Sequence, residues 1–173
     1  MSDAALATVT QVHGLGMILI RADLDRAGDA IAEAAGVAVP GKLGFTTDGA
    51  RWLGWMSPDE LLLILPRADL QDALAALTSV LSTEHALVLD VSDMRCVFDL
   101  TGPAPGQVLA KLCPVDLDRL PGRTVRRTRA AQIACALWRQ DDGWRIIAFR
   151  AITDYLRQVL EGAALPGTRL DPR

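Results

Sequence analysis

Three polar residues near the end of a predicted strand, Asp90, Ser92 and Asp93, carry side chains that could serve acid–base or ligand-binding chemistry. Carboxylates and hydroxyls in such positions more often satisfy the backbone groups of a turn. The sequence holds only two histidines, His13 and His85, and neither is placed by the sequence to complete a catalytic triad. We therefore interpret Asp90 and Ser92 as turn residues, and we assign no catalytic residue to this chain.

The cysteines and glycines do not form a recognisable site either. Cys96, Cys113 and Cys135 lack C-x-x-C spacing, and the two histidines lack metal-ligand spacing. Cys96 and Cys135 fall in strand-like apolar alternations, which favours an interpretation as small buried hydrophobic residues. No dinucleotide fingerprint, P-loop or G-x-S-x-G elbow is present. We expect no metal and no cofactor to be bound by this chain itself.

Composition bounds the class of protein. The 173 residues are 50% hydrophobic and 23% charged, which is typical of one globular domain or of two small ones that share a core. The net charge of −3 argues against a dedicated nucleic-acid binder. No apolar run reaches the roughly 18 residues of a membrane span, and the N-terminus does not resemble a secretory leader. We expect no membrane association and a cytoplasmic location.

The arginine-rich segment, residues 119–129 (RLPGRTVRRTR), contains five arginines and no acidic residue. It could be a solvated loop and strand edge, where arginine opposes edge-to-edge aggregation. It could instead be a docking surface for an acidic partner or for a carboxylate or phosphate tail. The chain has sixteen arginines and only two lysines, so arginine is less informative here than usual. The candidate partner contacts in this segment are Arg123, Arg126, Arg127 and Arg129.

A predicted strand at residues 51–56 is apolar on both faces. Such a strand either lies inside the domain or presents one face to another protein. Trp52 and Trp55 fall on opposite faces by strand alternation, and both are candidate partner contacts.

The elements around these residues indicate an α+β fold with mostly antiparallel sheets and helices packed on them. Helices interrupt hairpins instead of alternating strictly with strands, which argues against a doubly wound parallel sheet. We predict two ferredoxin-like α/β-plait units, at residues 14–83 and 84–165. Residues 1–13 and 166–173 are expected to be loose tails. The two strands within residues 86–100 are both assigned to the second unit.

A family resemblance runs through the second half of the chain. The stretch LDVSDMRCVFDLTGPAPGQVLAKLCPVDL, at residues 89–117, resembles the gamma subunit of bacterial heterotetrameric sarcosine oxidase. The likeness continues through GRTVRRTRAAQIACALWR and WRIIAFRAITDYLRQVLEGA, and upstream through RWLGWMSPDELLLIL. It spans about residues 51–163. The same pattern is more distantly similar to the folate-binding domains of glycine-cleavage aminomethyltransferases. The part of this chain that is aminomethyltransferase-like is the second predicted unit, residues 84–165.

The resemblance implies a non-catalytic gamma subunit of an oxidoreductase complex. Such a complex oxidises sarcosine to glycine and forms hydrogen peroxide and, with tetrahydrofolate as co-substrate, methylenetetrahydrofolate. It also implies alpha, beta and delta subunits as partners, which carry FAD, FMN, NAD and zinc. The alternative is a free-standing tetrahydrofolate-binding module or one-carbon transferase, in which the arginine-rich segment would contact the glutamate tail of the folate.

Overall fold

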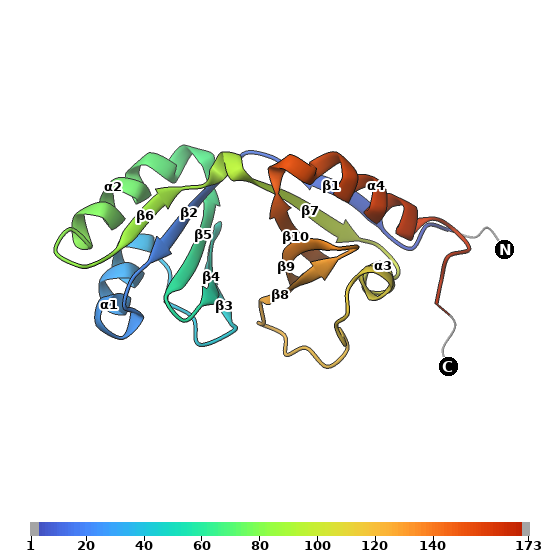
Figure 1. Ribbon diagram of the computed structural model, residues 1–173, viewed down its shortest axis with the longest axis horizontal. Helices are drawn as coiled ribbons and strands as arrows, with labels where there is room; N and C mark the ends of the chain where they lie inside the picture. Colours follow the sequence, from blue (N-terminus) through green and yellow to red (C-terminus); the bar gives the residue numbers. More distant parts are fainter. Residues whose placement is uncertain (1–3, 171–173) are drawn as a thin grey trace. The chain divides into compact units, whose positions relative to one another are not determined.

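The computed structural model describes residues 4–170 and divides into two compact units (Figure 1). The first unit comprises residues 14–93 together with 123–125, and the second comprises the rest of the chain. Each unit contains one five-stranded antiparallel sheet. Across residues 4–170 no helix is long and apolar enough to cross a membrane.

The first unit is built on a sheet of strand order β3-β4-β5-β2-β6. Its elements are β2 (Leu15–Arg21), α1 (Leu24–Ala35), β3 (Phe45–Asp48), β4 (Arg51–Ser57), β5 (Glu60–Pro66), α2 (Leu70–Val80) and β6 (Leu87–Asp90). Both helices bury an apolar stripe, and the core of this unit includes Ile20, Ile31, Leu63 and Leu77. Asp23 caps the start of α1, and Gly36 ends the helix with a φ of 66°.

The second unit has the strand order β1-β7-β10-β9-β8. Its elements are β1 (Thr8–Val12), β7 (Arg95–Thr101), α3 (Pro105–Leu112), β8 (Arg126–Ala130), β9 (Ile133–Gln140), β10 (Gly143–Phe149) and α4 (Thr153–Ala164). The core of this unit includes Phe98, Leu137, Ile146 and Leu156, all fully buried. Phe98 therefore faces the core, as the alternation of residues 96–100 predicts.

The two units share one topology. In the first, β2, α1, β4, β5, α2 and β6 follow the β-α-β-β-α-β order of a ferredoxin-like plait, with β3 added at the edge. In the second, β7, α3, β9, β10 and α4 follow the same order, and β8 is the added edge strand. The position of the last strand is taken by β1, from the start of the chain. The predicted α+β class with two plait-like, antiparallel units is confirmed.

The predicted division at residues 83 and 84 differs from the observed one. β6 pairs with β2 in the first sheet, whereas β7 pairs with β1 and β10 in the second. The chain therefore crosses from one unit to the other between Asp93 and Met94. A hairpin-like sequence pattern cannot reveal this, because the partners of both strands are distant in sequence.

The expectation of a loose tail at residues 1–13 is corrected by β1. Leu6 and Ala7 are buried in the core of the second unit, and the Leu6 amide donates a 2.8 Å hydrogen bond to the Ala164 carbonyl. The C-terminal tail is also held: the Leu170 amide donates to the Gln107 side chain at 2.9 Å. Residues 1–3 and 171–173 lie outside the described part of the chain.

Candidate functional site

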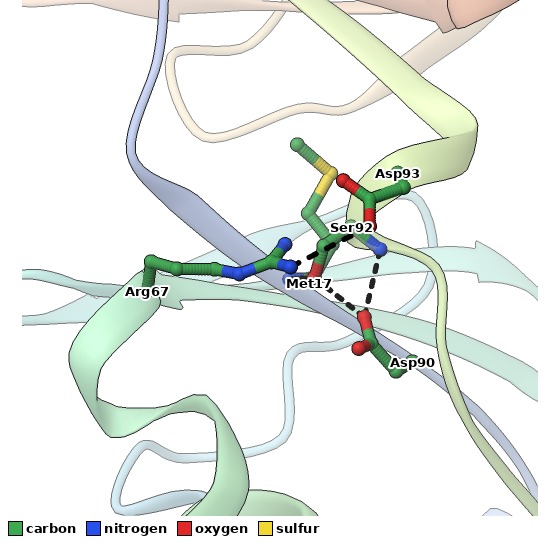
Figure 2. A network of polar contacts seen from close by, with 5 residues as sticks. All are labelled: Met17, Arg67, Asp90, Ser92 and Asp93. Atoms are coloured by element: carbon green, nitrogen blue, oxygen red, sulfur yellow. Dashed lines mark hydrogen bonds and ion pairs between the residues drawn. The ribbon is translucent and has the colours of Figure 1, made fainter.

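The polar residues at the end of β6 form a closed hydrogen-bond network in the first unit (Figure 2). One carboxylate oxygen of Asp90 accepts from the Ser92 hydroxyl at 2.5 Å and from the Ser92 amide at 2.9 Å. The Ser92 hydroxyl oxygen in turn accepts from the Met17 amide at 2.9 Å. The Met17 carbonyl accepts from the Val91 amide at the same distance. The network fastens the segment after β6 to β2.

The electrostatics of this network stabilise a charged carboxylate. The hydrogen bond from the Ser92 hydroxyl lowers the pKa of Asp90 from its ordinary value; burial opposes the shift, and the Ser92 amide and the Arg67 charge assist it. Ser92 is 8% exposed, and its hydroxyl is both donor and acceptor within the network. Because the hydroxyl both donates to the Asp90 carboxylate and accepts from the Met17 amide, it links β6 to β2.

Asp93 is exposed and forms an ion pair with an arginine. Its carboxylate lies 3.5 Å from the guanidinium of Arg67, an ion pair on the surface of the first unit (Figure 2). Exposed pairs of this kind contribute little to stability. Among residues 4–170 no group of three or more His, Cys, Asp or Glu side chains is arranged to hold a metal ion.

The two candidate tryptophans lie on opposite faces of β4, as strand alternation predicts. Trp52 is 7% exposed, and its ring stacks on Phe45 with centroids 5.6 Å apart. The same ring lies across Gly54, where a Cβ atom would stand 2.1 Å from a Trp52 ring carbon. Trp55 is half-buried and packs against the core of the first unit. Trp52 therefore offers little free surface to a partner.

Backbone hydrogen bonds order the arginine-rich segment from Arg123 onward. The Phe45 amide donates to the Arg123 carbonyl at 3.2 Å, and the Val125 amide donates to the Leu43 carbonyl at 2.8 Å. From Arg126 onward the segment forms β8, the edge strand of the second sheet, which is hydrogen-bonded to β9. The side chains of Arg123, Arg126, Arg127 and Arg129 are exposed. Arg126, Arg127 and Arg129 thus stand on the edge strand of the second unit, whereas Arg123 belongs to the first unit.

A pocket in the second unit was not anticipated from the sequence. It has a volume of about 560 Å³ and is formed by the start of α3, the loop after it and the turn between β9 and β10. The Arg139 guanidinium lies over the Trp144 ring at 4.8 Å, an arrangement that favours cation–π attraction. The charged residues that line it are Asp116, Asp118, Asp141, Asp142 and Arg139. The segments that form the pocket are distant in sequence, so no local motif indicates it.

The charge of this pocket argues against binding the glutamate tail of a folate. Four carboxylates line it against one guanidinium, and anionic ligands are repelled by such a lining. The arginines of β8 are not part of it. A smaller pocket of about 370 Å³ contains Lys111 and Arg129, but the Lys111 ammonium already donates to the Thr168 carbonyl and hydroxyl oxygens, each at 2.8 Å.

Comparison with known proteins places these features in a family. The model of the "Sarcosine oxidase, gamma subunit family" matches residues 21–165. The sarcosine oxidase subunit gamma of Corynebacterium sp. strain P-1 is 36% identical over 132 residues, which is 73% of this chain and 64% of that protein. The subunit from Arthrobacter sp. is 31% identical over 152 residues, which is 84% of this chain and 74% of that protein. The chain thus spans slightly less than two thirds of the first of these relatives.

Two solved structures are also similar. One chain of the heterotetrameric sarcosine oxidase from Corynebacterium sp. U-96, in complex with pyrrole 2-carboxylate, superposes with a TM-score of 0.86 at 30% identity. That match covers 96% of this chain and 88% of the other. The glycine cleavage system aminomethyltransferase T from Bartonella henselae superposes at 0.70 and 16% identity, over 92% of this chain and 46% of the other, which shows a shared fold. The family model and the curated relatives together show that this chain belongs to the sarcosine oxidase gamma subunit family.

Proposed function

We propose that this chain is a cytoplasmic, non-catalytic gamma subunit of a heterotetrameric sarcosine oxidase. The observation that carries the proposal is the superposition on a chain of the solved heterotetramer, with a TM-score of 0.86 over 96% of the residues. The partners are the alpha, beta and delta subunits. The reaction of the complex is the oxidative demethylation of sarcosine to glycine, with formation of hydrogen peroxide and methylenetetrahydrofolate.

In this proposal FAD, FMN, NAD and zinc are held by the partner subunits, and tetrahydrofolate is a co-substrate of the whole complex. The internal engagement of Asp90 and Ser92 supports the assignment, since their polar atoms fasten β6 to β2. The acidic lining of the pocket beside Trp144 supports it too, because it repels the anionic tail of a folate. The chain would then contribute surface and shape to the complex.

We propose that the docking surface is β8, the strand formed by the end of the arginine-rich segment. Arg126 and Arg129 are exposed on β8, whose backbone is already paired with β9 in the second unit, so little conformational entropy is lost when a partner binds. Arg123, in the first unit, and Arg127 stay predicted contacts. Clustered guanidinium groups favour a partner surface rich in carboxylates. Trp52 is the weaker candidate because it is buried in this chain, whereas half-buried Trp55 stays a predicted contact.

Co-expression with the alpha, beta and delta subunits tests both parts of the proposal. The chain is affinity-tagged, and the complex is isolated by size-exclusion chromatography in low and high salt. Two charge-reversal variants are compared: Arg126→Glu with Arg129→Glu on the edge, and Arg26→Glu with Arg169→Glu as a matched control. All four arginines are exposed, so both variants change the net charge equally and neither disturbs a core.

We expect the wild-type chain and the control variant to elute with the other subunits. The edge variant should dissociate at lower salt or elute alone. Elution of the wild-type chain always alone would refute membership of the complex. Equal retention of both variants would refute the docking surface and leave the membership standing.

A further inference from the structure

The pocket beside Trp144 is not explained by the proposed subunit role. Trp144 lies in β10 of the second unit, is only 4% exposed and lines this pocket of about 560 Å³. Its indole N–H donates no hydrogen bond to any acceptor among residues 4–170. The N–H of a buried tryptophan usually has an acceptor, because a buried donor without one is costly. This N–H therefore indicates a ligand that carries an acceptor atom.

The indole nitrogen faces the start of α3 across the pocket. A Cβ atom added to Gly106 would stand 3.6 Å from the Trp144 Nε1 atom, and both residues line the pocket. Apart from the helix backbone and the adjacent residues, no other atom of residues 4–170 lies within 4 Å of that position. A small group of a ligand can therefore reach the N–H from the pocket.

Two further features make this part of the pocket suitable for a carboxylate. Within the described residues no side chain caps the start of α3, and the first turn of this helix lines the pocket. The amide N–H groups of an uncapped first turn and the positive end of the helix dipole attract anions. The Arg139 guanidinium lies over the Trp144 ring at 4.8 Å, and its hydrogen bond to the Leu117 carbonyl is long, at 3.5 Å. It therefore keeps donors for a ligand.

The remaining charges of the pocket are acidic. Asp118 lies in the loop after α3, and Asp141 and Asp142 form the turn between β9 and β10. None of these three carboxylates has an ion pair or a hydrogen bond within the part of the chain that the structure describes. Asp116 is different, because it pairs with Arg119 at 3.3 Å. Three unpaired carboxylates that line one pocket attract a cation.

We propose that this pocket binds a basic amino acid. The ligand carboxylate accepts a hydrogen bond from the Trp144 N–H and pairs with the Arg139 guanidinium, and the cationic side chain of the ligand pairs with Asp141 and Asp142. The net positive charge of such a ligand complements a lining in which carboxylates outnumber the guanidinium. The volume of about 560 Å³ is within the range of small-molecule sites, about 300–1,000 Å³.

The site belongs to the second unit alone. Every residue that lines the pocket lies in that unit, and the arginines of β8 are not among them. Binding of the amino acid is therefore a function beyond the proposed subunit role, and it does not depend on the partner subunits or on the docking surface.

Matched ligands test the proposal on the full chain. L-Arginine and L-citrulline have nearly the same shape, but the side chain of citrulline carries no charge. Each is titrated at low ionic strength, because salt screens charge pairs, and binding is followed by calorimetry and by the indole N–H resonance of Trp144 in NMR spectra. We expect arginine to shift this resonance and to bind at least about tenfold more tightly than citrulline. No response to millimolar arginine, or equal affinity for the two ligands, overturns the proposal.

Agmatine, which is arginine without its carboxylate, tests the part of the site around Trp144. Gly106→Ala places a methyl group 3.6 Å from Nε1, an ordinary contact distance that leaves the fold intact, and Trp144→Phe removes the N–H itself. We expect both variants to weaken arginine binding severalfold and to leave agmatine binding unchanged. Equal effects on the two ligands, or none on either, overturn the assignment of the ligand carboxylate. The result for Gly106→Ala decides the matter if Trp144→Phe fails to fold.

Charge removal tests the acidic part of the site. Asp141→Asn with Asp142→Asn is compared with Asp29→Asn with Asp72→Asn, a matched control in which the exposed residues lie on α1 and α2 of the first unit. Both variants change the net charge equally. We expect the pocket variant to bind arginine at least about tenfold more weakly and the control to bind it as the wild type does. Equal losses in the two variants would overturn the site.

Discussion

Ser92→Ala should destabilise the first unit through the loss of one buried hydroxyl. The substitution leaves the Met17 amide without its acceptor at 2.9 Å and Asp90 without its hydroxyl donor at 2.5 Å. An unsatisfied buried group costs about 1–3 kcal/mol, and Asp90 keeps its bond from the residue 92 amide. We expect a loss of about 2 kcal/mol, a factor of roughly 30 in an equilibrium constant.

The loss should depend on pH in one direction. Because the pKa of Asp90 is held below its ordinary value of 3.8, this carboxylate contributes stability above pH 3.8, and that contribution is lost as the pH falls through the lowered pKa. The variant lacks the hydroxyl that is the largest cause of the lowered pKa. The difference between wild type and variant should be constant from neutral pH down to about pH 5 and should shrink in stronger acid. The part of the stability loss that comes from the unpaired Met17 amide should remain in acid.

Ser57→Ala is the matched control. The Ser57 hydroxyl donates to the Asp59 carboxylate at 2.8 Å, also two residues along the chain. Asp59 is half exposed, however, and in the contacts described for residues 4–170 no backbone amide donates to the Ser57 hydroxyl. We expect this control to change stability by less than about 0.5 kcal/mol.

Amide hydrogen exchange, read by NMR, measures both variants. In Ser92→Ala the Met17 amide and its neighbours in β2 should exchange roughly 30-fold faster at neutral pH, whereas the amides of β7 and β10 report on the second unit. Chemical denaturation gives the free energy of unfolding. The reasoning is wrong if Ser92→Ala and Ser57→Ala cost the same, or if the Met17 amide keeps its protection.

Four further predictions concern packing, an exposed arginine and a half-buried lysine. Phe98→Ala should lower the free energy of unfolding by about 3–5 kcal/mol in chemical denaturation, because Phe98 is fully buried. Arg127→Ala should lower it by well under about 1 kcal/mol, because Arg127 is exposed. A large loss of stability at Arg127 would contradict its assigned exposure. Gly54→Ala should cost about 1–3 kcal/mol and alter the near-UV circular dichroism, since the new Cβ would stand 2.1 Å from the Trp52 ring; an unchanged spectrum would count against that stacking. Lys111→Met should lower stability by about 1–2 kcal/mol and raise proteolysis after α4, because the ammonium binds oxygens beyond that helix; equal cleavage in both proteins would refute this role.

Several features of the helices and strands are set by near neighbours in the sequence. The apolar stripe of α2, the Asp23 cap and Gly36 stop of α1, and the alternation around Phe98 all depend on neighbours a few residues apart, so sequence alone carries them. The start of α3 at Pro105 is accompanied by a long-range contact: the Ala104 amide donates to the Leu6 carbonyl. That partner lies at the other end of the chain.

Turn chemistry was predicted where its residues are adjacent, and missed where they are not. The bonds from Ser92 to Asp90 follow from their spacing of two residues, and the interpretation of Asp90 and Ser92 as turn residues agrees with the observed network. The link from Ser92 to Met17 could not be foreseen, because it forms only when β6 pairs with β2. The acidic pocket beside Trp144 is a similar case, since three separated segments build it.

The sequence by itself determined the class of fold, the family resemblance and the identity of the exposed arginines. Only the tertiary structure decided which sheet each strand joins and that β1 completes the second unit. The physical reason is the range of the interactions: periodicity, caps and turns are set within a few residues, whereas strand order and side-chain pairing are set by the burial of surfaces far apart in the chain.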